Sequence, residues 1–292
     1  MNNVQQQLFG TQSFLAFTLD HRPIVGKPSA VLSNNVRVEL WDNGVLYFHP
    51  QDETLQNSLL LSVGVHGNET APIEIINQLV NDILAGKIMV KQNLLIVIAN
   101  PEAINAECRE VDENMNRLFS DDSMPKSSDS NERHRSRRLM EHSQTFFAAE
   151  ATQKIHYDLH TAIRGSFYKK FAISPNTVEV PATEYQYNVL GQWGIQAILS
   201  TQQKSPTYSA FTANACGATS FTLELGQVKP FGENDLDEFS SVIDGLVAAI
   251  SDDEDTSPTN TAVKSFSVAV EVFKKTEHFR LCFPIDTVNF SE

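Results

Sequence analysis

The chain has 292 residues, of which 41% are apolar and 20% charged, a composition typical of a soluble globular protein with room for one large domain and a small appendage. Its formal net charge of -14 argues against nucleic-acid binding, because contacts to phosphates need a basic surface. The net charge is compatible with a small anionic substrate. Locally clustered Arg or Lys must then bind that substrate, because the electrostatic field of the whole protein repels it.

The N-terminus and the cysteines indicate the compartment. Residues 1–10 are glutamine-rich and lack the basic and apolar regions of a signal peptide, and no apolar run approaches the ~18 residues of a membrane-spanning helix. We therefore predict a cytoplasmic protein that does not bind membranes. Cys108, Cys216 and Cys282 are odd in number and scattered, which predicts small buried thiols without a disulfide framework.

The N-terminal 50 residues contain the signal of a tight turn. Short apolar or alternating runs lie at residues 14–19, 36–40 and 45–48. The dipeptide Asn43-Gly44 separates the last two runs and is a strong hairpin signal. We expect an N-terminal β-hairpin.

The next segment predicts a parallel crossover unit. Residues 59–65 form an apolar run typical of a buried strand. A helix is expected to begin near Thr70 and to end before Gly86, and residues 94–99 form the next buried strand. A strand, a helix and a second strand at this spacing indicate an α/β fold.

The rest of the chain up to residue 250 continues this alternation. Further strands are predicted at residues 155–159, 168–173, 195–200 and 219–225. Helices are predicted at residues 132–150 and near residues 182–192 and 233–250, after a polar loop at 120–131. In the first of these helices, a solvated face is expected to carry Arg133, Arg135, Arg137 and Arg138.

The C-terminal part suggests a domain division. Residues 251–260 are acidic, turn-rich and devoid of apolar residues, so we interpret them as a linker. Beyond them, two segments alternate like the strands of a small β element. We predict a catalytic domain at residues 1–250 that includes the hairpin, an acidic linker at 251–260 and a short C-terminal β element at 261–292.

Three candidate metal ligands lie next to predicted strand ends. His66 and Glu69 lie between the strand at 59–65 and the helix after it, and His160 follows the strand at 155–159. Functional groups of an open α/β sheet gather beyond the carboxyl ends of its strands. Two imidazoles and one carboxylate leave the fourth position of Zn2+ open for water, whose pKa then falls to roughly 7. A helix N-cap role for residues 68–70 is the alternative interpretation.

Glu224 is a candidate general base. It lies inside the apolar run 219–225, where a carboxylate is costly to bury unless it is paired or functional. We expect it to take a proton from the metal-bound water and to pass it to the leaving amine. A carboxylate satisfied by a structural arginine is the alternative.

Candidate substrate contacts follow the strand at 94–99. Arg109, Asn116 and Arg117 belong to the same sheet edge, and guanidinium groups bind carboxylates bidentately. Apolar neighbours distinguish Asn116-Arg117 from a freely solvated charge run. Arg164, four residues after His160, is a further candidate contact for an anion.

Five motifs, in order, resemble the succinylglutamate desuccinylase and aspartoacylase family of zinc amidohydrolases. They are GVHGNE at 64–69, NPEAI at 100–104, the segment 109–117 ending in NR, DLHTAIRGS at 158–166 and TLELG at 222–226. The resemblance implies an α/β fold like that of the zinc carboxypeptidases, with a mixed central sheet flanked by helices. It also implies one Zn2+ per subunit and no other cofactor. By this resemblance, His66, Glu69 and His160 would be the zinc ligands, Glu224 the catalytic carboxylate, and Arg109, Asn116 and Arg117 the substrate contacts.

Two departures from the family pattern refine this expectation. Aspartoacylases carry an arginine in the loop before the catalytic glutamate, and residues 208–219 have none, which favours the desuccinylase branch. The family's DLNR motif is ENMNR here, which displaces the acidic residue to Glu113. Arg164 and Lys169 are then the candidates for binding the carboxylate of the acyl chain.

We therefore expect a zinc-dependent amide hydrolase that acts on a small anionic N-acyl amino acid. Its expected reaction is cleavage of N-succinyl-L-glutamate to succinate and L-glutamate, the last step of arginine degradation by the succinyl route. An aspartoacylase-like hydrolase, a carboxypeptidase-like peptidase and a non-catalytic anion-binding module are the alternatives. The sequence leaves the oligomeric state open.

Overall fold

The computed structural model describes most of the chain, namely residues 3–21, 24, 26–51, 57–120, 130–175, 182–201, 205–253, 263–270 and 287–290. Within these ranges, no helix is long and apolar enough to cross a membrane.

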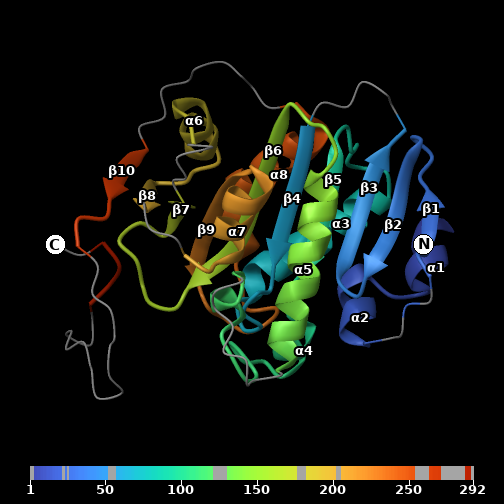
Figure 1. Cartoon of the computed structure of the whole chain (residues 1–292), viewed down its shortest axis with the longest axis horizontal. Coiled ribbons are helices and arrows are strands. Elements are labelled where there is room, and N and C mark those ends of the chain that lie inside the picture. The colour runs from blue at the N-terminus through green and yellow to red at the C-terminus, as the bar shows by residue number, and fades with distance from the viewer. Residues whose placement is uncertain are drawn as a thin grey trace.

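Ten strands of the described residues form a single mixed sheet (Figure 1). In chain order they are β1 (Ser29–Val31), β2 (Val36–Asp42), β3 (Val45–Pro50), β4 (Asn57–Val63), β5 (Asn93–Ile98), β6 (Gln153–Ala162), β7 (Lys170–Pro175), β8 (Ala197–Thr201), β9 (Thr219–Gln227) and β10 (Lys264–Ser267). Their order across the sheet is β1-β2-β3-β5-β4-β6-β9-β7-β8-β10. The central strands β5, β4, β6 and β9 run parallel, whereas β3 and β7 flank them in antiparallel pairs.

Helices cover both faces of this sheet. They are α1 (Asn3–Phe9), α2 (Phe14–Leu19), α3 (Thr70–Leu84), α4 (Pro101–Asn105), α5 (Asn131–Phe147), α6 (Glu184–Gln192), α7 (Tyr208–Cys216) and α8 (Ser240–Ser251), with 3-10 turns at Met115–Arg117 and Leu236–Phe239. Figure 1 shows α5 and α7 in front of the sheet and α3 and α8 behind it. The mixed α/β sandwich predicted from the sequence is confirmed.

The alternation of side chains along β4 explains the two layers. Leu59 and Leu61 pack in the core with α3 and α8, while Leu60 packs in a second core with α5 and α7. Strands buried on both faces are nearly continuous apolar runs, as β4 and β5 are. Ser62, a polar residue, faces the α7 side of β4 and is fully buried.

The predicted hairpin and crossover unit are both present. β2 and β3 pair antiparallel around Asn43-Gly44, and Gly44 adopts φ +71. β4, α3 and β5 form the parallel crossover. α3 ends before Gly86, whose positive φ follows the C-cap residue as in many helix ends. The apolar run at 14–19 forms the helix α2.

Two expectations for local structure are wrong. Residues 208–219 do not form a loop: most of them form α7, which begins after the N-cap residue Thr207. The arginines of α5 do not share one solvated face, because Arg133 and Arg135 are held by protein groups. Arg133 binds Glu113, and Arg135 donates to backbone carbonyls and to Asp42.

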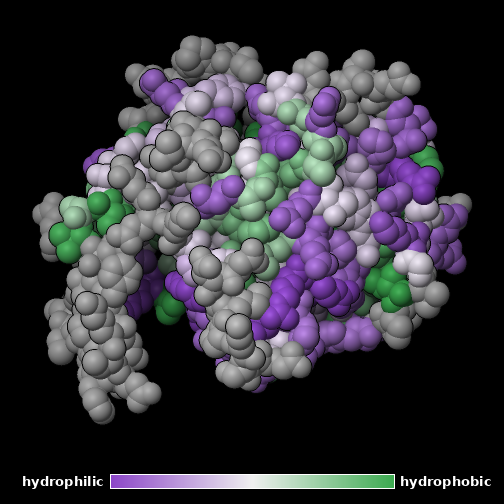
Figure 2. All heavy atoms as spheres, viewed as in Figure 1, coloured by the Kyte–Doolittle hydropathy of each residue, from purple (hydrophilic) through white to green (hydrophobic). Residues whose placement is uncertain are grey.

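The outer surface of α5 is nevertheless hydrophilic, as Figure 2 shows. Arg137 and Arg138 are exposed there. Arg138 nevertheless binds the buried carboxylate of Asp42, as Arg135 does. Three of the four arginines therefore tie α5 to other segments of the chain.

The C-terminal segments are described only in part. β10 pairs with β8 and extends the main sheet. Most of the acidic segment 251–260 and the predicted strand at 279–285 lie outside the described residues, so the domain division stays a prediction. Cys108 and Cys216 are partly buried free thiols, and Cys282 lies outside the described residues.

Candidate metal centre and active site

The loop from β4 to α3 places His66 and Glu69. At Gly67, an added Cβ would lie 2.1 Å from the carbonyl carbon of Ala103, so only glycine lets this loop pack directly on α4. The Gly67 amide donates to the carbonyl of Arg109 at 3.2 Å. Backbone contacts therefore fix the loop, and the side chains of His66 and Glu69 turn toward the sheet.

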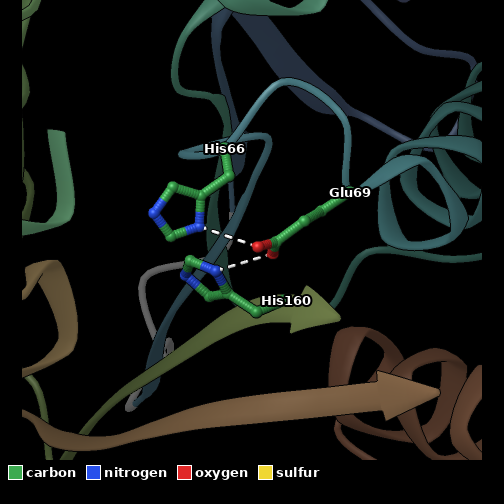
Figure 3. A group of neighbouring side chains, drawn as sticks. All are labelled: His66, Glu69 and His160. Carbon is green, nitrogen blue, oxygen red and sulfur yellow. Dashed lines mark hydrogen bonds and ion pairs between the residues drawn. The ribbon is translucent and has the colours of Figure 1, made fainter. Parts of the chain in front are cut away.

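His160 lies inside β6, which extends three residues beyond the predicted strand, to Ala162. The pairing of β6 with β9 becomes irregular just after His160. Bulges of this kind often lie beside active sites, where they reorient side chains. Figure 3 shows the imidazoles of His160 and His66 beside each other, both pointing at the carboxylate of Glu69.

The three side chains form a compact, buried cluster. Glu69 Oε1 lies 2.8 Å from His66 Nδ1, and Glu69 Oε2 lies 2.9 Å from His160 Nδ1 (Figure 3). One ligand atom from each residue lies within 4.8 Å of the others. Exposed fractions are 3% for His66 and 2% for Glu69 and His160, so solvent does not compete for these atoms.

Two further groups bind the Glu69 carboxylate. The backbone amide of Thr161 donates to Oε2 at 2.9 Å, and Arg109 Nη1 donates to Oε1 at 2.7 Å. Glu69 occupies the N-cap position of α3 but makes no capping hydrogen bond with its side chain. The alternative interpretation of this segment as a helix cap therefore does not account for its side chains.

Burial and charge oppose each other in the cluster. Burial raises the pKa of Glu69, but the charges of His160 and His66, together with the hydrogen bond from His160, outweigh it and hold the pKa well below its ordinary value. Burial lowers the pKa of His160, but Asp158 and Glu69 raise it well above its ordinary value. The cluster thus concentrates negative charge around two imidazoles, an arrangement that favours a cation.

The donor set fits a catalytic zinc ion. Two imidazoles and one carboxylate leave a tetrahedral metal with an open position. His66 Nδ1 is buried and, despite its 2.8 Å approach to Glu69, has no hydrogen-bond partner. A buried polar atom without a partner is costly in the absence of a ligand. His66, Glu69 and His160 are therefore the residues that can hold the metal.

Glu224 lies beside this cluster on β9. It is the cross-strand partner of His160 in the parallel pairing of β6 with β9. Its Oε2 is buried and has no hydrogen-bond partner, unlike a carboxylate neutralised by a structural arginine. Burial raises the pKa of Glu224 to about 7, and repulsion from Glu69 acts in the same direction. A carboxyl group with such a pKa can both accept and release a proton near neutrality.

A cavity of about 1230 Å³ lies over the cluster and Glu224. All four predicted substrate contacts line it: Arg109, Asn116, Arg117 and Arg164. Lys169 is exposed and is not among the described residues that line this cavity. Of the two candidates for an acyl carboxylate contact, only Arg164 lies at the cavity.

The segment 109–117 carries the cationic side of this cavity. Arg117 donates from Nη1 to the carbonyl of Asn116 at 2.7 Å, and burial together with the charge of Arg109 lowers its pKa. Asn116 Oδ1 accepts from the amide of Tyr208 at 3.0 Å. The amide NH2 of Asn116 is the group that remains for a ligand.

Asn114, not the displaced acid Glu113, lies against a candidate metal ligand. Asn114 Oδ1 lies 3.1 Å from His66 Nε2, whereas Glu113 binds Arg133 and Ser130. Glu113, the displaced acidic residue, therefore does not support a candidate metal ligand. Glu113 binds residues at the start of α5, and the amide oxygen of Asn114 contacts the imidazole of His66.

Two groups of site residues were missed in the sequence. Asp158 Oδ2 lies 3.0 Å from His160 Nε2, and the alternation of His156, Asp158 and His160 along one strand face was the signal that could have revealed it. An apolar part of the cavity wall comes from distant segments that share no local signal; its described members include Phe171, Leu199, Phe266 and Phe290.

Comparisons with known proteins agree with this geometry. Residues 56–250 match the sequence model of the succinylglutamate desuccinylase/aspartoacylase catalytic domain. Succinylglutamate desuccinylase of Shewanella amazonensis is 39% identical over 296 residues, with 97% of this chain and 84% of that protein covered.

Solved structures give the same result. The succinylglutamate desuccinylase structure from Vibrio parahaemolyticus superposes with a TM-score of 0.89 at 31% identity, covering 97% of this chain and 83% of that one. The structure from Chromobacterium violaceum has a TM-score of 0.83 at 33% identity, covering 95% and 86%. The predicted zinc-carboxypeptidase-like fold is confirmed, and the chain belongs to the succinylglutamate desuccinylase/aspartoacylase family.

Proposed function

We propose that the chain is a zinc-dependent amide hydrolase that cleaves N-succinyl-L-glutamate into succinate and L-glutamate. The observation that carries the proposal is the buried cluster of His66, Glu69 and His160 beside the carboxylate of Glu224, whose Oε2 has no hydrogen-bond partner. The names of the similar Shewanella and Vibrio proteins support the substrate. We also propose that the reaction is the last step of arginine degradation by the succinyl route, in the cytoplasm.

Different residues of the chain would have different roles in the reaction. Zinc bound by the cluster would supply a Lewis acid and an acidified water. Glu224 would accept a proton from the attacking water and deliver it to the amide nitrogen of the leaving glutamate. Arg109, which lines the cavity beside the cluster, would stabilise negative charge that develops on the carbonyl oxygen.

The arginines would bind the carboxylates of the substrate. N-succinyl-L-glutamate carries three carboxylates, and a chain with a net charge of -14 repels them at long range. Arg117 and the amide of Asn116 would bind the glutamate part, while Arg164, which follows β6, is the candidate for the acyl carboxylate. Charge-assisted hydrogen bonds at short range would then outweigh the repulsion.

A substrate panel tests the proposal. Purified protein is assayed with N-succinyl-L-glutamate, N-acetyl-L-aspartate and a dipeptide with a free C-terminus, each with and without a chelator. Because a lost buried charge-assisted contact costs about 2 to 5 kcal/mol, kcat/KM for N-succinyl-L-glutamate should exceed that for N-acetyl-L-aspartate by at least ~10^2. Preference for acetylaspartate or for the dipeptide would instead indicate an aspartoacylase or a carboxypeptidase. Binding without hydrolysis of any of them would indicate an anion-binding module.

A further inference from the structure

A chain of buried hydrogen bonds runs from His160 away from the cavity. Asp158 Oδ2 lies 3.0 Å from His160 Nε2, and Asp158 Oδ1 accepts from the Ser62 hydroxyl. Ser62 Oγ lies 2.8 Å from His156 Nε2, and His156 Nδ1 lies 2.7 Å from Thr212 Oγ1. Each of these five residues is at most 2% exposed, so water does not share in the hydrogen bonds.

The direction of each bond follows from the number of protons available. A carboxylate accepts and does not donate, so His160 must carry its proton on Nε2, and Ser62 must direct its hydroxyl proton to Asp158. Ser62 Oγ then accepts from His156 Nε2. The three bonds that join His160, Asp158, Ser62 and His156 are satisfied in only one direction, and their protons point toward Asp158.

These hydrogen bonds also determine the role of the other nitrogen of His160, Nδ1. Nδ1 faces the Glu69 carboxylate at 2.9 Å, so without a metal it carries a proton as well. A metal ion would replace that proton and take the Nδ1 lone pair, while Nε2 would keep its proton for Asp158. We propose that Asp158 is a positioning residue for the metal ligand His160: its carboxylate fixes the ring orientation and the Nε2–H tautomer, and thereby directs the Nδ1 lone pair to the metal. This inference rests on the proposed zinc site.

His66 provides an internal comparison. Its Nε2 faces the neutral amide oxygen of Asn114 at 3.1 Å, so both imidazoles present Nδ1 to the cluster but only His160 is backed by a carboxylate. Asp158 is fully buried, whereas Asn114 is partly exposed. The Asp158 contact is thus the stronger of the two constraints on a ligand.

Zinc affinity measured by chelator competition tests the role. Outer-shell partners of metal ligands typically change metal affinity 10- to 100-fold, so Asp158→Ala should weaken zinc binding by about that factor. Asp158→Asn, which offers an amide oxygen as at His66, should lose less. Ser62→Ala is the matched control, because it removes a hydroxyl from the same buried layer and leaves the Asp158 to His160 bond; its zinc affinity should change less than ~3-fold. Asp158→Ala binding zinc as tightly as Ser62→Ala overturns the inference.

A measurement on the unaltered protein covers the case in which Asp158→Ala fails to fold. In zinc-loaded protein labelled with 15N-histidine, long-range 1H–15N spectra should show His160 protonated on Nε2 and metal-bound through Nδ1. Binding through Nε2 contradicts the inference. If the wild-type chain binds no zinc, the proposed function and this inference fail together. If it binds zinc and the Asp158 variants match the control, only the inference fails.

Discussion

The floor of the cavity and its arginine rim are built in different ways. The floor consists of His66, Glu69, His160 and Glu224, which the loop after β4 and the paired strands β6 and β9 hold in fixed register. The rim consists of Arg109, Arg117 and Arg164, which lie in connecting segments; Arg117 and Arg164 are exposed. Substitutions in the floor should therefore remove the chemistry, whereas substitutions of the exposed rim residues Arg117 and Arg164 should change substrate binding.

The largest effect is expected at the proposed metal ligands. His66→Ala, Glu69→Ala and His160→Ala should each lose stoichiometric zinc and measurable hydrolysis together, because a site with two ligands binds the metal poorly. Metal content after dialysis and turnover of N-succinyl-L-glutamate measure the two losses. A variant that kept one zinc per chain at about nanomolar free metal would remove that residue from the ligand set.

Substitution of Glu224 should impair the chemical step without impairing metal binding. Glu224→Gln preserves the shape of the side chain but cannot accept a proton, so turnover should fall by roughly 10^2 to 10^4. Zinc content and substrate affinity should stay close to those of the wild type. Near-native turnover in this variant would mean that another group moves the proton.

Substitutions in the rim should change mainly KM. Arg117→Gln removes a cation from the cavity, and we expect kcat/KM to fall about 10- to 100-fold for a partly exposed charge-assisted contact, with most of the change in KM. Arg137→Gln removes an exposed arginine from α5 and serves as the control. A loss of kcat at unchanged KM in Arg117→Gln would place Arg117 in the chemical step and weaken the distinction between floor and rim.

The raised pKa of Glu224 also predicts a cost in stability. The folded chain holds a proton on Glu224 up to about pH 7, whereas the unfolded chain releases it near pH 4.5. The folded state therefore binds more protons between these values, and this group's contribution to stability falls as pH rises from 4.5 to 7.

Metal-free Glu224→Gln should consequently be more stable than the metal-free wild type at pH 8, by at most about 3 kcal/mol, and the difference should shrink toward pH 5. Urea unfolding at the two pH values measures it. A variant that is less stable at pH 8 would show that Glu224 is stabilised as a carboxylate in the fold.

The floor was largely predictable from the sequence, because its residues are adjacent to apolar strands and strand ends converge in an α/β sheet. The residues that contact the two histidines from outside the cavity were not predictable in the same way. Asp158 was taken as part of an apolar strand although its spacing from His160 places both on one face. Asn114 contacts His66 only through the fold of its segment, and no spacing in the sequence reveals that contact.

Helical segments produced the other errors, and each has a physical cause. Arg133 and Arg135 are charged, which favours solvent, but in α5 they reach carboxylate and carbonyl acceptors that belong to distant segments. Residues 208–216 combine small and polar side chains with weak helical periodicity, and helix α7 is fixed by its Thr207 cap and its packing on β9. Tertiary contacts of this kind override local preference.

A zinc titration of metal-free protein tests the central claim most directly. Turnover of N-succinyl-L-glutamate is measured as zinc is added in sub-stoichiometric steps. The account predicts activity that rises in proportion to bound zinc, reaches its plateau at one zinc per chain, and is absent throughout in Glu69→Ala. Full turnover by metal-free wild-type protein, or a plateau that Glu69→Ala also reaches, would contradict it.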